Sequence, residues 1–453
     1  MTRTAILVCS RVGLDELPDR FPTLVVDDLC RSPAAAAQAL QTVGATRVVL
    51  GLCDHRAGGD VLAALRRAGA EPFGIEAVAV KEADEPLRLL AAAAAKLTRL
   101  APDEPARQLL SAHALSRRAL FSRGFIDHAP VAVIDDDLCV GTVRCRLCTA
   151  ACPSDAIDSH GAYPLVDVSA CSGCAACIRP CPTNAIHLSG AAPAQLEAQL
   201  KELLEFAEGI LFACENARAA AAPAGWALVT LPTLALVTPG WILQIRARGR
   251  EVELLGCGGA CCSGTAATQM FAERLLDDRH CSPRSPAPPL RLSEPTATVE
   301  ALQRISSSPS ESAIEDPESP LGLLTLTADR CTLCGACATS CPTHALQLDD
   351  QTDEAVLRYR HGACTACGCC VSVCPENALA LARGIRPALL RTGAQPLLSA
   401  PHETCSECAA PLPPQALRKR LRELLPDLAG SPLSICAVCA RRAKRALAAT
   451  DQT

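Results

Sequence analysis

Eight cysteines in the C-terminal half of the chain repeat one spacing twice, C-x2-C-x2-C-x3-C-P, with Pro342 and Pro375 closing the two copies. Three thiolates on one tight loop can each bond one iron of a four-iron cube, and the cysteine before proline completes the neighbouring cluster. The spacing therefore predicts two [4Fe–4S] clusters, one on Cys331, Cys334, Cys337 and Cys374 and one on Cys364, Cys367, Cys370 and Cys341. Zinc binding or a disulfide framework are the alternatives. The surplus Cys369 is expected to be a small buried residue.

The same plan recurs earlier in the chain with one irregular half. Cys171, Cys174, Cys177 and Cys181 precede Pro182 and match in full, whereas the half that ends at Pro153 has Thr142 where a cysteine is required. Cys139 lies three positions too early, and the extra residues include Gly141, which can form a longer loop. We expect one cluster on Cys139, Cys145, Cys148 and Cys181 and one on Cys171, Cys174, Cys177 and Cys152. A [3Fe–4S] site or a lost cluster are the alternatives for the irregular half.

Both modules resemble the bacterial two-cluster ferredoxins in these motifs. The resemblance implies a βαββαβ-type chain path around each pair of clusters and a role in electron transfer. It does not identify the electron donor or acceptor.

A further pair of C-x2-C groups lies near the C-terminus (Cys405, Cys408, Cys436 and Cys439). Four thiolates in two knuckles suit tetrahedral zinc, as in a zinc-ribbon-like module. A rubredoxin-like iron site or a further cluster are the alternatives. The segment between the knuckles is expected to be a basic helix.

The N-terminal 84 residues alternate apolar strands with helices, which predicts a small parallel sheet. The stretches "LVCSRVG", "DDLCRSP" and "TRVVLGLCDHRAG" resemble the N-terminal domain of the flavin-bearing subunit of heterodisulfide reductase, which holds an additional cluster. Cys9, Cys30 and Cys53 match cysteines of that family, while Arg11 replaces another. They are candidate ligands of an extra cluster or, alternatively, buried small residues at strand ends.

The middle domain resembles the delta-type iron–sulfur subunit of methyl-viologen-reducing hydrogenases, from "ILFACEN" to "VELLGCGGACCSG". That family holds a [2Fe–2S] centre, and Cys214, Cys257 and Cys262 stand at matching places. Thr233 replaces a family cysteine, and Cys261 is a possible substitute ligand. A docking fold without its cluster is the alternative.

The expected fold class is multidomain α/β with two ferredoxin-like modules and a small C-terminal zinc-ribbon-like module. The expected boundaries are a small α/β domain (1–84), a helical connector (85–122), ferredoxin module 1 (123–189), a second α/β domain (190–280), a Pro/Ser-rich linker (281–320), ferredoxin module 2 (321–384) and a four-cysteine knuckle with a helix (385–453).

Composition narrows the setting of the protein. The 29 cysteines of the 453 residues gather in C-x2-C groups, which favours metal ligation in a reducing compartment, the cytoplasm. A signal peptide and a transmembrane segment are not expected. The net charge of −5 argues against nucleic acid as a partner.

These features favour an electron-transfer subunit of a multi-subunit redox complex that relays electrons through four [4Fe–4S] clusters and is itself non-catalytic. Its expected partners are redox proteins, namely flavoprotein, hydrogenase, formate dehydrogenase or heterodisulfide-reductase-like subunits. The alternatives are a reductase with its own catalytic site at Cys257–Cys262 and a redox-responsive regulator.

Overall fold

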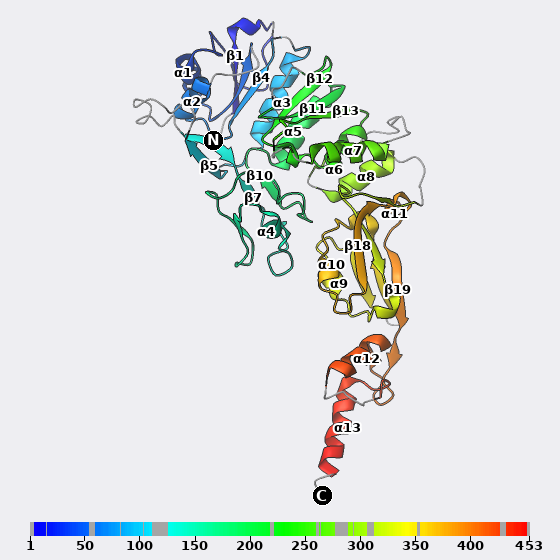
Figure 1. Ribbon diagram of the computed structural model, residues 1–453. Coiled ribbons are helices and arrows are strands. Elements are labelled where there is room, and N and C mark those ends of the chain that lie inside the picture. The colour runs from blue at the N-terminus through cyan, green and yellow to red at the C-terminus, as the bar shows by residue number, and fades with distance from the viewer. Residues whose placement is uncertain are drawn as a thin grey trace. The chain divides into compact units, whose positions relative to one another are not determined.

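The computed structural model divides into two compact units, Met1–Ile305 and Ser306–Thr453. It describes residues 4–14, 16–53, 59–81, 83–102, 104–110, 126–217, 222–259, 262, 264–276, 289–292, 294–305, 312–350, 354–425 and 432–450. The expected substitute ligand Cys261 lies outside the described residues. Figure 1 shows the elements in chain order.

The first domain is a four-stranded parallel sheet in the order β2-β1-β3-β4, formed by β1 (Thr4–Cys9), β2 (Thr23–Val26), β3 (Arg47–Leu52) and β4 (Ile75–Ala79). Helices α1 (Pro33–Val43) and α2 (Gly59–Arg67) pack against each other, and α1 packs on β1 and β2. Both ends of α1 are capped. Ser32 accepts a hydrogen bond from the Ala35 amide, and Gly44 closes the helix with a φ of 61°.

Helix α3 (Pro86–Thr98) joins the first domain to the second, because it packs on β1, β3 and β4 and also on α5 (Pro193–Leu203). The expectation that residues 85–122 are helical throughout is wrong for one stretch. There β5 (Ala106–Leu110) pairs antiparallel with β6 (Ile126–Pro130). The rest of that segment, 111–122, lies outside the described residues.

The second domain is a three-stranded parallel sheet in the order β12-β11-β13, formed by β11 (Gly209–Cys214), β12 (Trp226–Leu231) and β13 (Glu251–Leu255). Helix α6 (Pro239–Arg246) contacts α7 (Thr265–Leu276) and α8 (Pro295–Ile305). Helix α8 falls inside the expected linker, so that expectation is wrong for this stretch. Ala297, Ala301 and Leu302 are buried and supply the apolar face that makes it a helix of the domain.

The two ferredoxin-type modules follow one chain path. Module 2 runs β15 (Gly322–Leu326), α9 (Ala336–Thr339), β16 (Leu346–Asp350), β17 (Glu354–Tyr359), α10 (Cys369–Ser372) and β18 (Leu379–Ile385), with β15 antiparallel to β18 and β16 antiparallel to β17. Module 1 has shorter strands, namely β7 (Ala132–Ile134), β8 (Ile157–Asp158), β9 (Leu165–Val166) and β10 (Ile186–Leu188), with α4 (Leu147–Ala151) between β7 and β8.

Short strands extend module 2 on both sides. Strand β14 (Ile314–Glu315) pairs with β18, and β19 (Gln395–Pro401) pairs with β17. The tail follows with a two-stranded ribbon, β20 (Glu403–Thr404) and β21 (Pro411–Leu412), and two helices, α12 (Gln415–Leu424) and α13 (Ala437–Thr450). Among the described residues, no helix has both the length and the hydropathy that a membrane span requires.

Candidate iron–sulfur and metal sites

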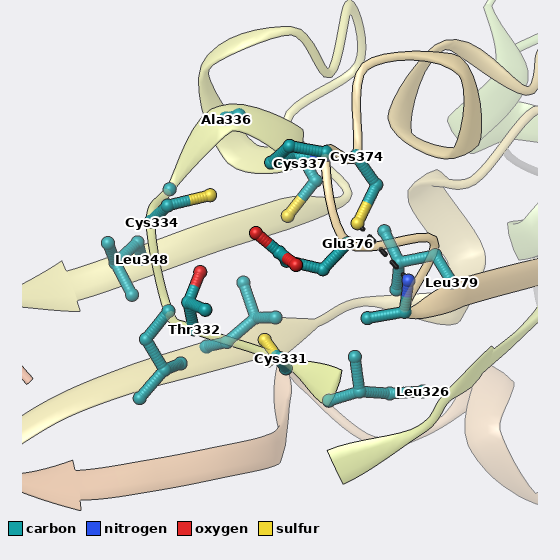
Figure 2. A pocket seen from close by; sticks show the side chains of 15 residues that line it. Leu326, Cys331, Thr332, Cys334, Ala336, Cys337, Leu348, Cys374, Glu376 and Leu379 are labelled. Atoms are coloured by element: carbon teal, nitrogen blue, oxygen red, sulfur yellow. Dashed lines mark hydrogen bonds between the residues drawn. The ribbon is translucent and has the colours of Figure 1, made fainter. Parts of the chain in front are cut away.

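The cysteine before each proline lies with the loop cysteines of the opposite half of its module. Cys374 lines one cavity together with Cys331, Cys334 and Cys337, and Figure 2 shows this set in an apolar surround that includes Leu326, Leu348 and Leu379. Two further cavities repeat the arrangement, and their cysteine sets are Cys341 with Cys364, Cys367 and Cys370, and Cys152 with Cys171, Cys174 and Cys177. Three of the four quartets expected from the spacing therefore each line one cavity.

The loop thiols are held in surroundings that disfavour free thiolates. Burial, and after it the charge of neighbouring cysteines, raises the pKa of Cys177 and Cys370 to about 12 and that of Cys337 to about 11. Thiols gathered without water can become thiolates only with a cation among them, which suits the irons of a cluster. The donor set and the apolar lining therefore fit a [4Fe–4S] cluster.

The turn that follows each cysteine before a proline directs a backbone amide at the sulfur of that cysteine, a hydrogen bond that the sequence reasoning missed. In all four copies, the sulfur accepts a hydrogen bond from the amide of the alanine four residues later, at 3.2–3.3 Å (Ala156 to Cys152, Ala185 to Cys181, Ala345 to Cys341 and Ala378 to Cys374). The residue before each alanine has a left-handed φ of 47–52° (Asp155, Asn184, His344 and Asn377). The signal in the sequence was the fourfold pattern C-P-x-[DNH]-A.

These amides bear on the chemistry of the site. Amide hydrogen bonds favour a negatively charged sulfur and are one means by which a protein tunes the potential of a cluster. Aspartate and asparagine tolerate the left-handed conformation, which explains their place in the turn. His344 takes this position in one of the turns, where its side chain is exposed at a φ of 52°.

Cys139 has the same surroundings as the first of the three loop cysteines in the regular motifs. Burial raises its pKa, and a hydrogen bond from the Gly141 amide opposes the rise. Cys331 and Cys364 likewise accept the amide two residues later, and that residue is left-handed in each loop (Gly141 at 81°, Leu333 at 56° and Ala366 at 55°).

Two observations bring the irregular quartet together. Cys181 and Cys145 act electrostatically on Cys139, and the same two cysteines raise the pKa of Cys148, after burial, which is the largest cause. The amide of Cys139 also donates to the Asp135 carbonyl at 2.9 Å, just as the amide of Cys171 donates to that of Asp167. The four cysteines therefore lie in one neighbourhood.

Thr142 stands where the regular spacing has a cysteine, and it has a different task. Its side chain is buried, and the hydroxyl donates to the carbonyl of Gly161 at 2.5 Å, while its amide donates to Ala162 at 2.9 Å. These bonds fasten the longer loop to the segment before β9. The longer loop is therefore held by specific hydrogen bonds, and its first cysteine stands at position 139 in place of position 142.

Two neighbours of the second cavity in module 2 have distinct roles. Cys369 is buried in α10, as expected, and does not line either cavity of the module. Tyr359 lines the cavity of Cys364, and its side chain hydrogen-bonds to that sulfur, which lowers the pKa of Cys364 against the larger effect of burial. The single hydroxyl hydrogen of Tyr359 is shared with the Gly322 carbonyl, whose oxygen lies 2.5 Å from the hydroxyl oxygen.

The tail brings its four cysteines together as expected. The sulfurs of Cys405, Cys408, Cys436 and Cys439 all lie within 4.8 Å of one another. The Cys436 amide donates to the Cys405 sulfur at 3.2 Å, and this bond, together with others from Glu407 and Cys408, lowers the pKa of Cys405 to about 6. Cys436 directly precedes α13, so one knuckle lies at a helix start.

The sheets of the two α/β domains each gather three cysteines. The sulfurs of Cys9, Cys30 and Cys53 all lie within 4.8 Å of one another, and so do those of Cys214, Cys257 and Cys262. Thr233, which replaces a family cysteine, is buried and caps a short 3-10 helix by accepting the Ala235 amide. A [2Fe–2S] centre needs four thiolates, and the described residues of the second set supply three.

Module 1 shares a hydrophobic core with the second α/β domain. Ala175 and Leu188 of the module pack in one buried cluster with Cys214 and Cys262. Arg179 of the module also donates to the Thr268 hydroxyl of α7 at 2.7 Å. The three-cysteine set of the second sheet is therefore built into the same core as module 1.

Comparison with known proteins agrees with this geometry. Residues 132–187 and residues 330–378 each match a family model described as a 4Fe-4S dicluster domain. The first match includes the irregular loop with Cys139. No curated protein matches the chain. Two segments of the chain are therefore 4Fe-4S dicluster domains of ferredoxin type, which indicates electron transfer.

Proposed function

We propose that the protein is an electron-transfer subunit that holds four [4Fe–4S] clusters, two in each ferredoxin-type module. The observation that carries the proposal is the exchange of the pre-proline cysteine between the halves of a module, which assembles three of the four quartets around an apolar cavity. A bound cluster would supply a one-electron carrier, and each module would hold two of them.

The residues of the chain set the conditions for such carriers. The sixteen ligands we assign are Cys139, Cys145, Cys148 and Cys181; Cys171, Cys174, Cys177 and Cys152; Cys331, Cys334, Cys337 and Cys374; and Cys364, Cys367, Cys370 and Cys341. Leucine side chains around the cavities exclude water, and the amides of the C-P-x-x-A turns stabilise the charge on the sulfurs.

We assign the tail cysteines to one zinc ion, because four sulfurs within 4.8 Å match the edges of a tetrahedron around Zn²⁺, about 3.8 Å for Zn–S bonds of about 2.3 Å. This site is structural, since it ties the ribbon β20–β21 to the start of α13.

The partners we infer are other redox proteins, such as flavoprotein, hydrogenase, formate dehydrogenase or heterodisulfide-reductase-like subunits, in a multi-subunit complex. The resemblances of the two α/β domains support this inference. No disulfide joins the described cysteines, which suits a reducing compartment such as the cytoplasm.

Anaerobic purification with quantification of iron and acid-labile sulfide, followed by EPR of the reduced protein, tests the proposal. We expect about sixteen irons and sixteen sulfides per chain, and spin-coupled signals from neighbouring [4Fe–4S]⁺ clusters. About eight irons with correspondingly more zinc would contradict the four-cluster proposal.

A further inference from the structure

Three thiols meet at the carboxyl edge of the first parallel sheet. Cys9 is the last residue of β1, Cys53 directly follows β3, and Cys30 returns over them from the loop after β2. In the strand order β2-β1-β3-β4, the chain leaves β1 towards β2 and leaves the neighbouring β3 towards β4, in the opposite direction along the sheet. Such a switch point is where open α/β sheets bind ligands.

The backbone holds these thiols in place. Leu29 is fully buried, and the amides of Arg31 and Ser32 both donate to the Asp28 carbonyl at 2.8 Å, which fixes the loop that presents Cys30. Hydrogen bonds from the amides of Arg11 and Cys30 reach the sulfur of Cys9. The amide of Cys53 likewise reaches the sulfur of Cys30. These amides form a ready outer shell for metal-bound thiolates.

The spacing of the sulfurs distinguishes a single ion from a cluster. The Sγ atoms of Cys9 and Cys53 are 3.8 Å apart, and those of Cys30 and Cys53 are 3.2 Å apart. Thiolates that share one tetrahedral ion lie about 3.8 Å apart. Thiolates of a four-iron cube bond to different irons and lie much further apart. The ferredoxin cysteines, all of them described residues, form no set of three within 4.8 Å.

The residues that the structure describes contribute three donors to this set. Among the described residues, no further Cys, His, Asp or Glu joins it. Arg11, which replaces a cysteine of the resembled family, forms an ion pair with Asp28. Three protein ligands on zinc are typical of sites that keep one position open for an exchangeable ligand.

We propose that Cys9, Cys30 and Cys53 bind one thiophilic metal ion of the zinc class, and that the open fourth position accepts an external thiolate. Soft thiolate ligands select zinc over hard cations, and a soft fourth ligand matches them. This site goes beyond the electron-transfer proposal and does not depend on it.

The second sheet repeats the arrangement. Cys214 ends the central strand β11, and Cys257 follows the neighbouring strand β13, with its sulfur 3.7 Å from that of Cys262. The compact spacing of this set matches that of the first. Any metal bound by this second set does not affect the test below, because the parent chain and the variants all contain the set and only their difference in metal content is measured.

Metal quantification of the full chain, purified anaerobically with zinc present, tests the single-ion site. We expect Cys30→Ser to lower zinc by about one ion per chain and to leave iron unchanged. The matched control is Arg31→Ala, the exposed neighbour, which leaves both metals unchanged. Cys30→His offers a nitrogen ligand in place of the sulfur and restores zinc.

Loss of several irons in Cys30→Ser would show that the site holds a cluster, and unchanged zinc would show that it holds no ion. Either result overturns the proposal. Failure of the four-cluster proposal would give a different result. The parent chain itself would then contain too little iron, while Cys30→Ser would still bind about one zinc ion fewer than the parent chain.

Cadmium-113 NMR of the full chain loaded with cadmium tests the open position without any substitution at the site. Cys408→Ser, which breaks the tail set, identifies the tail resonance. We expect a separate resonance typical of three sulfur ligands, which moves downfield towards the four-sulfur range when 2-mercaptoethanol is added. A resonance already in the four-sulfur range before addition, or no response to the thiol, would overturn the exchangeable position.

Discussion

At the residue scale, the irregular ferredoxin loop is explained by two side chains. Thr142 is buried and bonded to the Gly161 carbonyl, and Cys139 accepts the Gly141 amide in the way that regular first cysteines accept theirs. The sequence left open whether a ligand was missing. The geometry favours a displaced ligand, since the loop between Cys139 and Cys145 is anchored by its own hydrogen bonds.

Replacing Cys139 should therefore affect one cluster. We expect Cys139→Ser to lower iron by one to about four atoms per chain, because one iron loses its thiolate while twelve ligands of the other clusters are untouched. EPR of the reduced protein should show changed signals from one cluster only. Val143→Ala, at an exposed position of the same loop, is the control and should keep all iron. A full iron content in the Cys139→Ser variant would contradict this assignment.

His361 makes the stability of module 2 depend on pH. Burial lowers its pKa, and Arg386 adds to this against an opposing hydrogen bond with the Gly322 carbonyl at 2.9 Å. The neutral ring also accepts the Arg386 amide on Nε2 at 3.0 Å. Since the pKa is lower in the folded state than the usual ~6.5, the unfolded state binds more protons between the two values. The contribution is complete above about pH 6.5 and is lost as the pH falls through the folded pKa.

Thermal unfolding of the anaerobic holoprotein from pH 7.5 to pH 5.5 checks this. We expect the melting temperature to fall on acidification, and His361→Asn to reduce that fall. The same variant should lose about 1–3 kcal/mol at neutral pH, because the Arg386 amide loses its acceptor. His344→Asn, which removes an exposed histidine from a turn that elsewhere carries asparagine, should keep the pH dependence. An identical dependence in His361→Asn would show that another group is responsible.

At the scale of elements, the tail helix α12 contacts a cluster cavity of its own unit. Arg420 of α12 pairs with Glu376 at 2.9 Å, and Glu376 lines the cavity of Cys331, Cys334, Cys337 and Cys374, as Figure 2 shows. The Arg420 guanidinium compensates the negative charge of the Glu376 carboxylate, which lies beside sulfurs that also carry negative charge when a cluster is bound. Helix α12 thus adds a tuning contact to the module.

Breaking this pair should shift the reduction potential of one cluster. An uncompensated carboxylate disfavours the added electron, so Arg420→Ala should lower the potential, and Glu376→Gln should raise it, each by about tens of millivolts. Redox titration followed by EPR measures the shift. Glu423→Gln, the other exposed partner of Arg420, is the control and should leave the potential nearly unchanged. Shifts of the same sign in Arg420→Ala and Glu376→Gln would contradict the electrostatic explanation.

The elements also show what the sequence could and could not predict. The strands and helices of both sheets follow from alternating apolar runs with clear caps, such as Ser32 and Gly44, and they form as expected. Helix α8 was missed because its neighbours are rich in proline and serine, and because its apolar face is recognised only from its packing against α6. Strand β5 was missed because its polar sequence, "ARQLL", depends on pairing with β6.

At the scale of the whole molecule, the segment that shares one hydrophobic core with module 1 is longer than the segment that carries its cysteine motifs. The motifs suggested that each ferredoxin module is a separate unit. The contacts instead join module 1 to the second α/β domain, because Leu188 and Ala175 pack with Phe212 and Ile210 of β11. Sequence spacing defines a ligand set, whereas the extent of a core depends on which apolar side chains meet in space.

Fragments of the chain should reveal this difference. A chain of residues 306–453 contains one complete compact unit, and we expect it to fold, to hold two clusters and to keep its tail ion. A chain of residues 1–305 should likewise hold its two clusters. A chain cut after residue 190 leaves Leu188 and Ala175 without the core of β11 and α5, and burial of such side chains contributes about 25 cal/mol per Å². We therefore expect residues 1–190 to lose iron and to melt at a lower temperature than residues 1–305. Equal iron content and equal melting temperatures for these two fragments would show that module 1 folds independently of the second sheet.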